Sequence, residues 1–120
     1  MAIGRVHQRE IVEVPFSLPD GQILPHPALV ISCDELQDVE PGMFYAVLIS
    51  TKNHFPELTI PIKSEWLSMP LPQQSFFVTH IVNPFNVDDV FAHRNCFLRQ
   101  PYFDDVVNHI VANIIDGAWG

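Results

Sequence analysis

Apolar and polar residues alternate in several short stretches of the chain, and a period of two residues predicts β-strands. In residues 9–16, Val12, Val14 and Phe16 lie on one side with Glu13 between them. Residues 43–50 are instead apolar at both odd and even positions. Because a strand covered on both faces has no polar side, this second segment is the best candidate for the middle of a sheet.

Other short apolar segments predict further strands. These are residues 28–32, 58–62, 76–82 and 96–98. Pro61 lacks an amide hydrogen, which restricts its strand to a sheet edge or a bulge. Between the last two strands, residues 83–95 are expected to be irregular with a short helical turn.

The strand predicted at residues 76–82 carries a polar residue in an apolar row. Phe76, Val78, His80 and Val82 are expected to share one face, because side chains alternate along a strand. A polar residue in such a row is either a hydrogen-bonded core side chain or part of a functional site. His80 is therefore a candidate site residue.

The period changes near the C-terminus. Apolar residues recur there with helical spacing at Phe103, Val106, Val107, Ile110, Val111, Ile114 and Ile115. Pro101 suits the first turn of a helix, and Gly117 offers a stop. Several short strands and one terminal helix predict a mainly β fold with short α segments, in which a small, strongly bent antiparallel sheet is closed by the C-terminal helix.

The composition is typical of one compact domain over residues 1–120. A chain of this length can bury a core without a metal or a disulfide, and 48% hydrophobic with 17% charged residues is far from a disordered composition. The longest apolar run is too short to cross a bilayer, so we expect no membrane association. The N-terminus lacks a secretory pattern, and we expect the protein in the cytoplasm.

The charge balance limits the partners of the whole molecule. Six Lys and Arg against fourteen Asp and Glu give a formal net charge of −8. This balance repels a polyanion over the molecule as a whole, although phosphate affinity depends on where the few cations lie. An acidic face could equally bind a basic partner.

The segment around Pro27 points to a site at the start of a strand. Pro27 removes a backbone donor and pushes His26 toward an extended conformation. We expect His26 where a loop becomes strand, with its ring able to point into a cleft. The alternative is a solvated loop histidine that caps nearby backbone.

Three passages, in this order, resemble the MazF/PemK family of toxin endoribonucleases. Residues 9–16 resemble the opening strand of the family. Residues 26–32, His-Pro-Ala-Leu-Val-Ile-Ser, resemble its Arg-Pro-x-Leu-Val-apolar-Ser segment. Residues 47–52, Val-Leu-Ile-Ser-Thr-Lys, resemble the next strand, which ends in Ile-Thr or Ile-Ser-Thr. The resemblance implies an SH3-like, PemK-type barrel and metal-independent cleavage of single-stranded RNA, with no cofactor.

The resemblance also implies site residues, with two departures. His26 stands where the family has an arginine, and Val82 stands where a second arginine often lies. Ser50 or Thr51 matches the hydroxyl that acts on the scissile phosphate.

Cleavage by the 2′-hydroxyl of the RNA needs a base, an acid and donors to the charged phosphorane. Because imidazoles titrate in the useful range, His26 and His80 are the predicted pair. Ser50 or Thr51 would donate to the phosphate, and Lys52 or Arg94 would bind substrate through their charge.

Two other functions stay open on the sequence. The same barrel could be a non-catalytic module that binds a peptide or an antitoxin-like protein, as the acidic balance and the missing arginines suggest. It could also be a structural subunit or a small-ligand binder, since a fold does not determine chemistry. The resemblance further implies a homodimer and an antitoxin-like partner.

Overall fold

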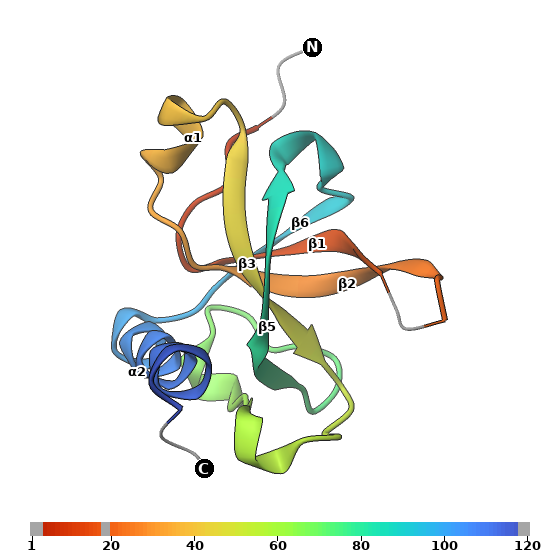
Figure 1. Cartoon of the computed structure of the whole chain (residues 1–120), viewed down its shortest axis with the longest axis vertical. Helices are drawn as coiled ribbons and strands as arrows, with labels where there is room; N and C mark the ends of the chain where they lie inside the picture. The colour runs from red at the N-terminus through yellow and green to blue at the C-terminus, as the bar shows by residue number, and fades with distance from the viewer. Residues whose placement is uncertain (1–3, 18–19, 118–120) are drawn as a thin grey trace.

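A computed structural model describes residues 4–17 and 20–117, and a six-stranded antiparallel sheet dominates them (Figure 1). The strands are β1 (Glu10–Ser17), β2 (Ile23–Val30), β3 (Met43–Ser50), β4 (Thr59–Pro61), β5 (Phe76–Asn86) and β6 (Ala92–Phe97). Their order in the sheet is β4-β5-β3-β2-β1-β6. The mainly β fold class is confirmed, and β3 has the predicted bounds and a central place.

Helical segments lie at the ends and turns of this sheet. They are α1 (Leu36–Val39), α2 (Gln100–Ile110) and a π-helical continuation of α2 (Val111–Asp116), with 3₁₀ turns η1 (Pro56–Leu58), η2 (Ser64–Trp66) and η3 (Val87–Asp89). Pro101 lies in the first turn of α2, and Gly117 ends the helical stretch with a left-handed φ of 67°. No helix in the described part of the chain is long and apolar enough to cross a membrane.

The two faces of the bent sheet bury separate hydrophobic clusters. On the helix-side face, the buried side chains of α2 pack with strand residues that include Leu29, Val47, Ile49 and Phe77, and with Leu98, which follows β6. On the second face, the cluster includes Val12, Val14, Phe16, Ala28, Val30, Phe44 and Ala46. Odd and even residues of β2 and β3 therefore serve opposite faces, as strand alternation requires.

A register shift divides β5 and separates Val82 from the face that it was predicted to share with Val78 and His80. Val47 of β3 pairs with Val82, but the next residue, Leu48, pairs with Val78. Residues 79–81 thus form a bulge, which resets the direction of the side chains. The prediction that Val78, His80 and Val82 share one face is wrong, because Val82 packs against the helix-side cluster, whereas Leu48, the partner of Val78, packs against the second cluster.

The segment after the bulge also differs from the prediction. Residues 83–95 were expected to be irregular, but β5 continues to Asn86 and β6 begins at Ala92, with the expected helical turn, η3, between them. Backbone hydrogen bonds pair these segments with β3 and β1 although their side chains are mixed in polarity. The alternation of apolar and polar residues therefore does not predict this backbone pairing.

Candidate active site

His26 lies inside a strand and not at the junction of a loop and a strand. It pairs with Val14 in β2, which begins at Ile23, so the predicted loop to residue 26 is wrong. The prolines on either side of His26 cannot donate to a neighbouring strand. This explains why β2 pairs with β1 from Ile23 onward but with β3 only from Ala28 to Val30.

The ring of His26 is half-buried on the second face of the sheet. It meets the ring of Phe16 edge to face, with 6.1 Å between ring centroids. Its Nε2 atom is buried and has no hydrogen-bond partner among the described residues. Unpaired buried nitrogens are uncommon, which makes this ring a candidate for a functional role.

His80 lies in the β5 bulge and lines a small hollow of about 100 Å³. The His80 hollow is also lined by Leu48, Ser50, Lys52, His54, Phe55, Thr59, Val78 and Ile81. Phe55 meets the imidazole edge to face at 5.5 Å between centroids. Nδ1 of His80 is buried without a partner among the described residues.

Ser50 and Lys52 bring a hydroxyl and a charge to the His80 hollow. Ser50 ends β3, and its Oγ accepts a hydrogen bond of 3.1 Å from the backbone N–H of Lys52. This bond fixes the turn after the strand and orients the hydroxyl. The exposed ammonium of Lys52 therefore lies one short turn from Ser50.

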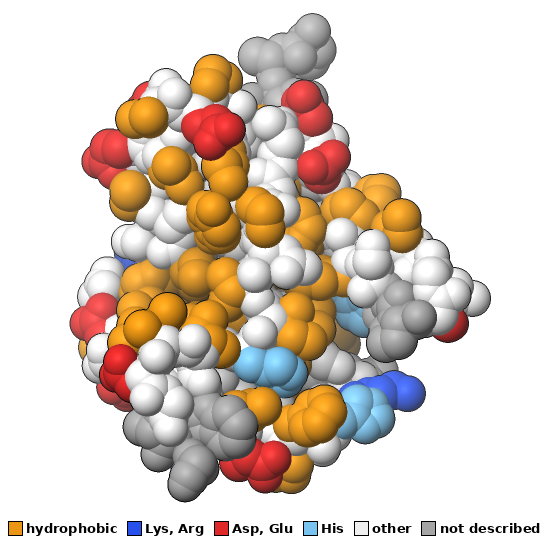
Figure 2. All heavy atoms as spheres, viewed as in Figure 1, with side chains coloured by type: hydrophobic (Ala, Val, Ile, Leu, Met, Phe, Trp, Pro, Cys, Tyr) orange, Lys and Arg blue, Asp and Glu red, His pale blue; other side chains and the backbone are white. Residues whose placement is uncertain are grey.

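The sheet register relates His26 to this hollow. Ala28 pairs with Leu48, and both lie on the second face; His26 and Ser50 are each two residues further along their strands, so strand alternation directs them toward the same face. His26 is not among the residues that line the His80 hollow. Figure 2 shows histidine side chains in one region of the visible surface, next to a basic side chain. The two predicted histidines thus share a face, and one of them lies in the hollow.

Thr51 and Arg94 lie in a different hollow. This Arg94 hollow, of about 280 Å³, is lined by Pro27, Thr51, Leu71, Pro72, Gln73, Ser75 and Arg94. Arg94 of β6 donates from Nη1 to the Glu13 carboxylate at 2.8 Å, and both side chains are half-buried. Since Glu13 offsets the guanidinium charge, this hollow carries no net positive charge from the pair.

The sequence reasoning missed two residues that shape these hollows. Phe55, in the loop after β3, holds the ring of His80. The sequence pattern marks Glu13 only as a polar position between apolar neighbours, yet its carboxylate neutralises Arg94. An isolated aromatic residue in a loop and a partner 81 positions away give no periodic signal.

The structure of this chain resembles known proteins, although its sequence does not match a known family. The sequence matches no protein-family model and no curated protein. Among solved structures, MazF from Deinococcus radiodurans aligns with a TM-score of 0.73 at 12% identity, covering 92% of this chain and 97% of that one. The toxin MazF-mt6 from Mycobacterium tuberculosis aligns with a TM-score of 0.64 at 15% identity, covering 90% and 97%.

The chain has the MazF fold. A further match is an endoribonuclease from a mycobacterial species in complex with its cognate antitoxin, at a TM-score of 0.67 and 12% identity, covering 92% of this chain and 95% of that one. These TM-scores establish the MazF fold. Because the sequence identities are low, the chemistry must be argued from the residues of this chain.

Proposed function

We propose that the protein is a toxin-like endoribonuclease that cleaves single-stranded RNA without a metal, from a single domain spanning residues 1–120. The observation that supports the proposal is the His80 hollow at the end of β3, which His80, Ser50 and Lys52 line together on a MazF fold. These groups supply a proton-transfer residue, a donor and a charge, as phosphodiester cleavage requires.

The reaction uses the RNA's own 2′-hydroxyl. One imidazole takes the hydroxyl proton while the oxygen attacks the adjacent phosphorus, and a second protonates the 5′-oxygen as its bond to phosphorus breaks. The products are a 2′,3′-cyclic phosphate and a 5′-hydroxyl end. His80 carries one of the transfers and His26, on the same face, carries the other, while Ser50 and Lys52 stabilise the phosphorane.

Replacement of each histidine tests this mechanism. We expect His80→Ala and His26→Ala each to slow cleavage of a single-stranded RNA by about 10²- to 10⁴-fold, as loss of a general acid or base does. The matched control is His109→Ala, because His109 is exposed on α2 and bonds to the backbone of Asp105. Unchanged cleavage in both site variants would remove them from the mechanism.

A chemically altered substrate assigns the two roles. An RNA with a 5′-bridging sulfur has a leaving group that needs no general acid. The variant whose rate this substrate restores has lost the acid, and the other has lost the base. If it restores neither variant, the acid is not a histidine of this pair.

The biological setting follows from the same proposal. We propose a cytoplasmic toxin that forms a homodimer and is held by an antitoxin-like protein. Two of the matched structures support the partner, since they are complexes of MazE with MazF from Deinococcus radiodurans and of the mycobacterial endoribonuclease with its antitoxin. Expression of the wild-type chain should arrest growth, and His80→Ala should not.

A second candidate is a non-catalytic module that binds a peptide or an antitoxin-like protein. The net charge of −8 and the offset of Arg94 by Glu13 favour it, because both weaken attraction to RNA. Under this alternative the wild-type chain neither cleaves RNA nor arrests growth.

A further inference from the structure

The Arg94 hollow differs in chemistry from the His80 hollow. Its walls include the apolar side chains of Pro27, Leu71 and Pro72, and its polar groups include Thr51, Gln73 and Arg94. A phosphate would need an uncompensated cation, but the Arg94 guanidinium is paired with Glu13. The hollow therefore suits a neutral, flat ligand with hydrogen-bonding edges.

The segment that carries Gln73 is held in place. Gln74 donates from Nε2 to the carbonyls of Ile62 (3.2 Å) and Ser75 (2.9 Å). The buried Ser75 donates from Oγ to the Gln73 carbonyl at 3.0 Å. These bonds tie residues 73–75 to one another and to the end of β4, so that the position of Gln73 is set before any ligand arrives.

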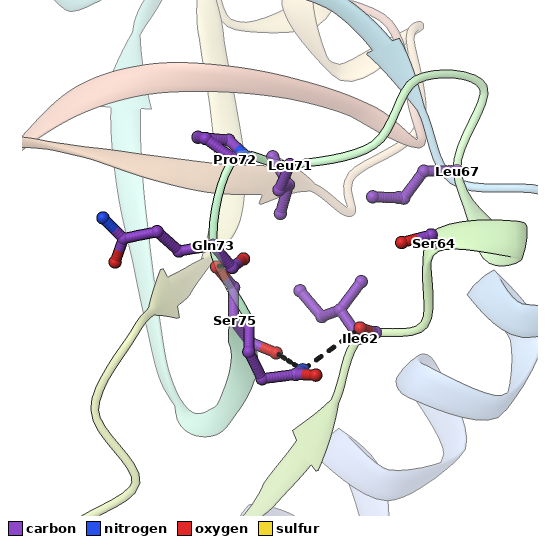
Figure 3. A pocket seen from close by; sticks show the side chains of 8 residues that line it. Ile62, Ser64, Leu67, Leu71, Pro72, Gln73 and Ser75 are labelled. Atoms are coloured by element: carbon purple, nitrogen blue, oxygen red, sulfur yellow. Dashed lines mark hydrogen bonds between the residues drawn. The ribbon is translucent and has the colours of Figure 1, made fainter.

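The side chain of Gln73 is itself free to act in the Arg94 hollow. A neighbouring hollow of about 170 Å³ lies on the other side of the segment, between it and the residues from Ile62 to Leu67. Figure 3 shows the Gln73 side chain pointing away from Ile62 and Leu67. Gln73 thus lines both hollows, and its side chain extends away from the Ile62 side, which favours the hollow that Thr51 and Arg94 also line.

We propose that the Arg94 hollow binds a purine base of the RNA next to the cleaved bond, with Gln73 and Arg94 reading its edge. This inference rests on the proposed endoribonuclease function. An arginine fork pairs with O6 and N7 of guanine, and a glutamine amide pairs with N6 and N7 of adenine. A volume of about 280 Å³ lies near the lower bound for ligand clefts, roughly 300 Å³, so it suits one base and not a longer segment.

The position of the hollow fits a strand of RNA that crosses the end of β3. Ser50 lines the His80 hollow and the adjacent Thr51 lines the Arg94 hollow. When a phosphate lies beside Ser50 and Lys52, the attached nucleotide lies near the next protein residue, Thr51, which lines the Arg94 hollow. Bases of single-stranded RNA are unstacked and can turn into such a pocket.

Cleavage-site mapping tests the reading of the base. On a randomised single-stranded RNA pool, the wild-type chain should prefer a purine at one position beside the cut. Gln73→Ala and Arg94→Lys should each lower that preference about tenfold, since a bidentate contact discriminates by roughly this amount or more. Gln100→Ala is the control, because Gln100 is an exposed glutamine on α2 that bonds to Asp104.

A binding measurement separates this inference from the proposed function. Adenosine, guanosine, cytidine and uridine are titrated into the ¹⁵N-labelled wild-type chain and the Gln73→Ala variant, and amide shifts are followed by NMR. Purine-selective shifts around residues 71–75 that Gln73→Ala abolishes support the pocket, even if the chain cleaves no RNA. Cleavage without a purine preference, or a preference that both variants keep, overturns the pocket while the nuclease stands. Absence of both cleavage and nucleoside binding overturns both.

Discussion

The two hollows beside the end of β3 are built from neighbouring residues but differ in charge and chemistry. Ser50 shares its hollow with His80 and with Lys52, which has no ion pair among the described residues, whereas Thr51 shares its hollow with Arg94, which Glu13 neutralises. Because side chains alternate along a strand, one short motif supplies a hydroxyl to each side. One short sequence motif thus contributes to two hollows, for which we propose a phosphate and a base as the respective ligands.

Removal of each hydroxyl tests whether the two hollows have different roles in cleavage. We expect Ser50→Ala to slow RNA cleavage by about 10²-fold, the effect of losing one donor to a charged intermediate, and Thr51→Ala to slow it by less than about tenfold. Single-turnover cleavage of one RNA measures both rates. Ser50→Thr is the control, because it keeps a hydroxyl at the end of β3. A larger loss in Thr51→Ala would exchange the roles of the two hollows.

Neutralising Glu13 tests the effect of its charge on the Arg94 hollow. Glu13→Gln keeps the size of the side chain but leaves the Arg94 guanidinium without its counter-charge. The affinity for single-stranded RNA should rise severalfold at low salt, and the slope of log K against log salt should steepen by about 0.7, the value for one additional phosphate contact. Fluorescence anisotropy of a labelled RNA at several salt concentrations measures both. An unchanged slope would show that Arg94 is already available to phosphate.

Much of the fold could be predicted because it follows from local pattern. The unbroken apolar character of residues 43–50 marked the central strand, and helical spacing from Pro101 marked α2. The β5 bulge could not be predicted, since it depends on the pairing of Val47 with Val82 and of Leu48 with Val78. A register shift is set by two strands together, and neither sequence segment records it alone.

The candidate site was only partly predictable for the same reason. The family resemblance selected Ser50, Thr51 and two histidines, but it could not say that Ser50 and Thr51 line separate hollows. Nor could it show that His26 lies within β2, where Val14 is its partner. The separation depends on side-chain direction at the end of a strand, which becomes definite only when the sheet's bend and neighbours are fixed.

A charge change far from both hollows tests whether local or net charge governs RNA binding. Asp34→Asn and Glu13→Gln each remove one negative charge from a chain of net charge −8. Asp34 lies before α1, where it accepts hydrogen bonds from Nδ1 of His7 (2.9 Å) and the backbone N–H of Gln8 (2.8 Å). If charge acts locally, Asp34→Asn should change RNA affinity by less than about twofold, since separated surface charges are screened in salt. Equal effects of the two variants would show that the Glu13–Arg94 pair has no special role.

The same variant should affect stability with a defined pH dependence. The hydrogen bond from His7, followed by that from the backbone of Gln8, lowers the pKa of Asp34 below its usual 3.8. The carboxylate therefore stabilises the fold above this value, and the contribution is lost as the pH falls through the lower pKa of the folded state. Because the pair is partly exposed, Asp34→Asn should cost only about 0.5–1 kcal/mol at pH 7. Urea unfolding should show this difference at pH 7 and its progressive disappearance below pH 3.8, whereas a difference that persists in strong acid would mean that packing, and not the charge of Asp34, is responsible.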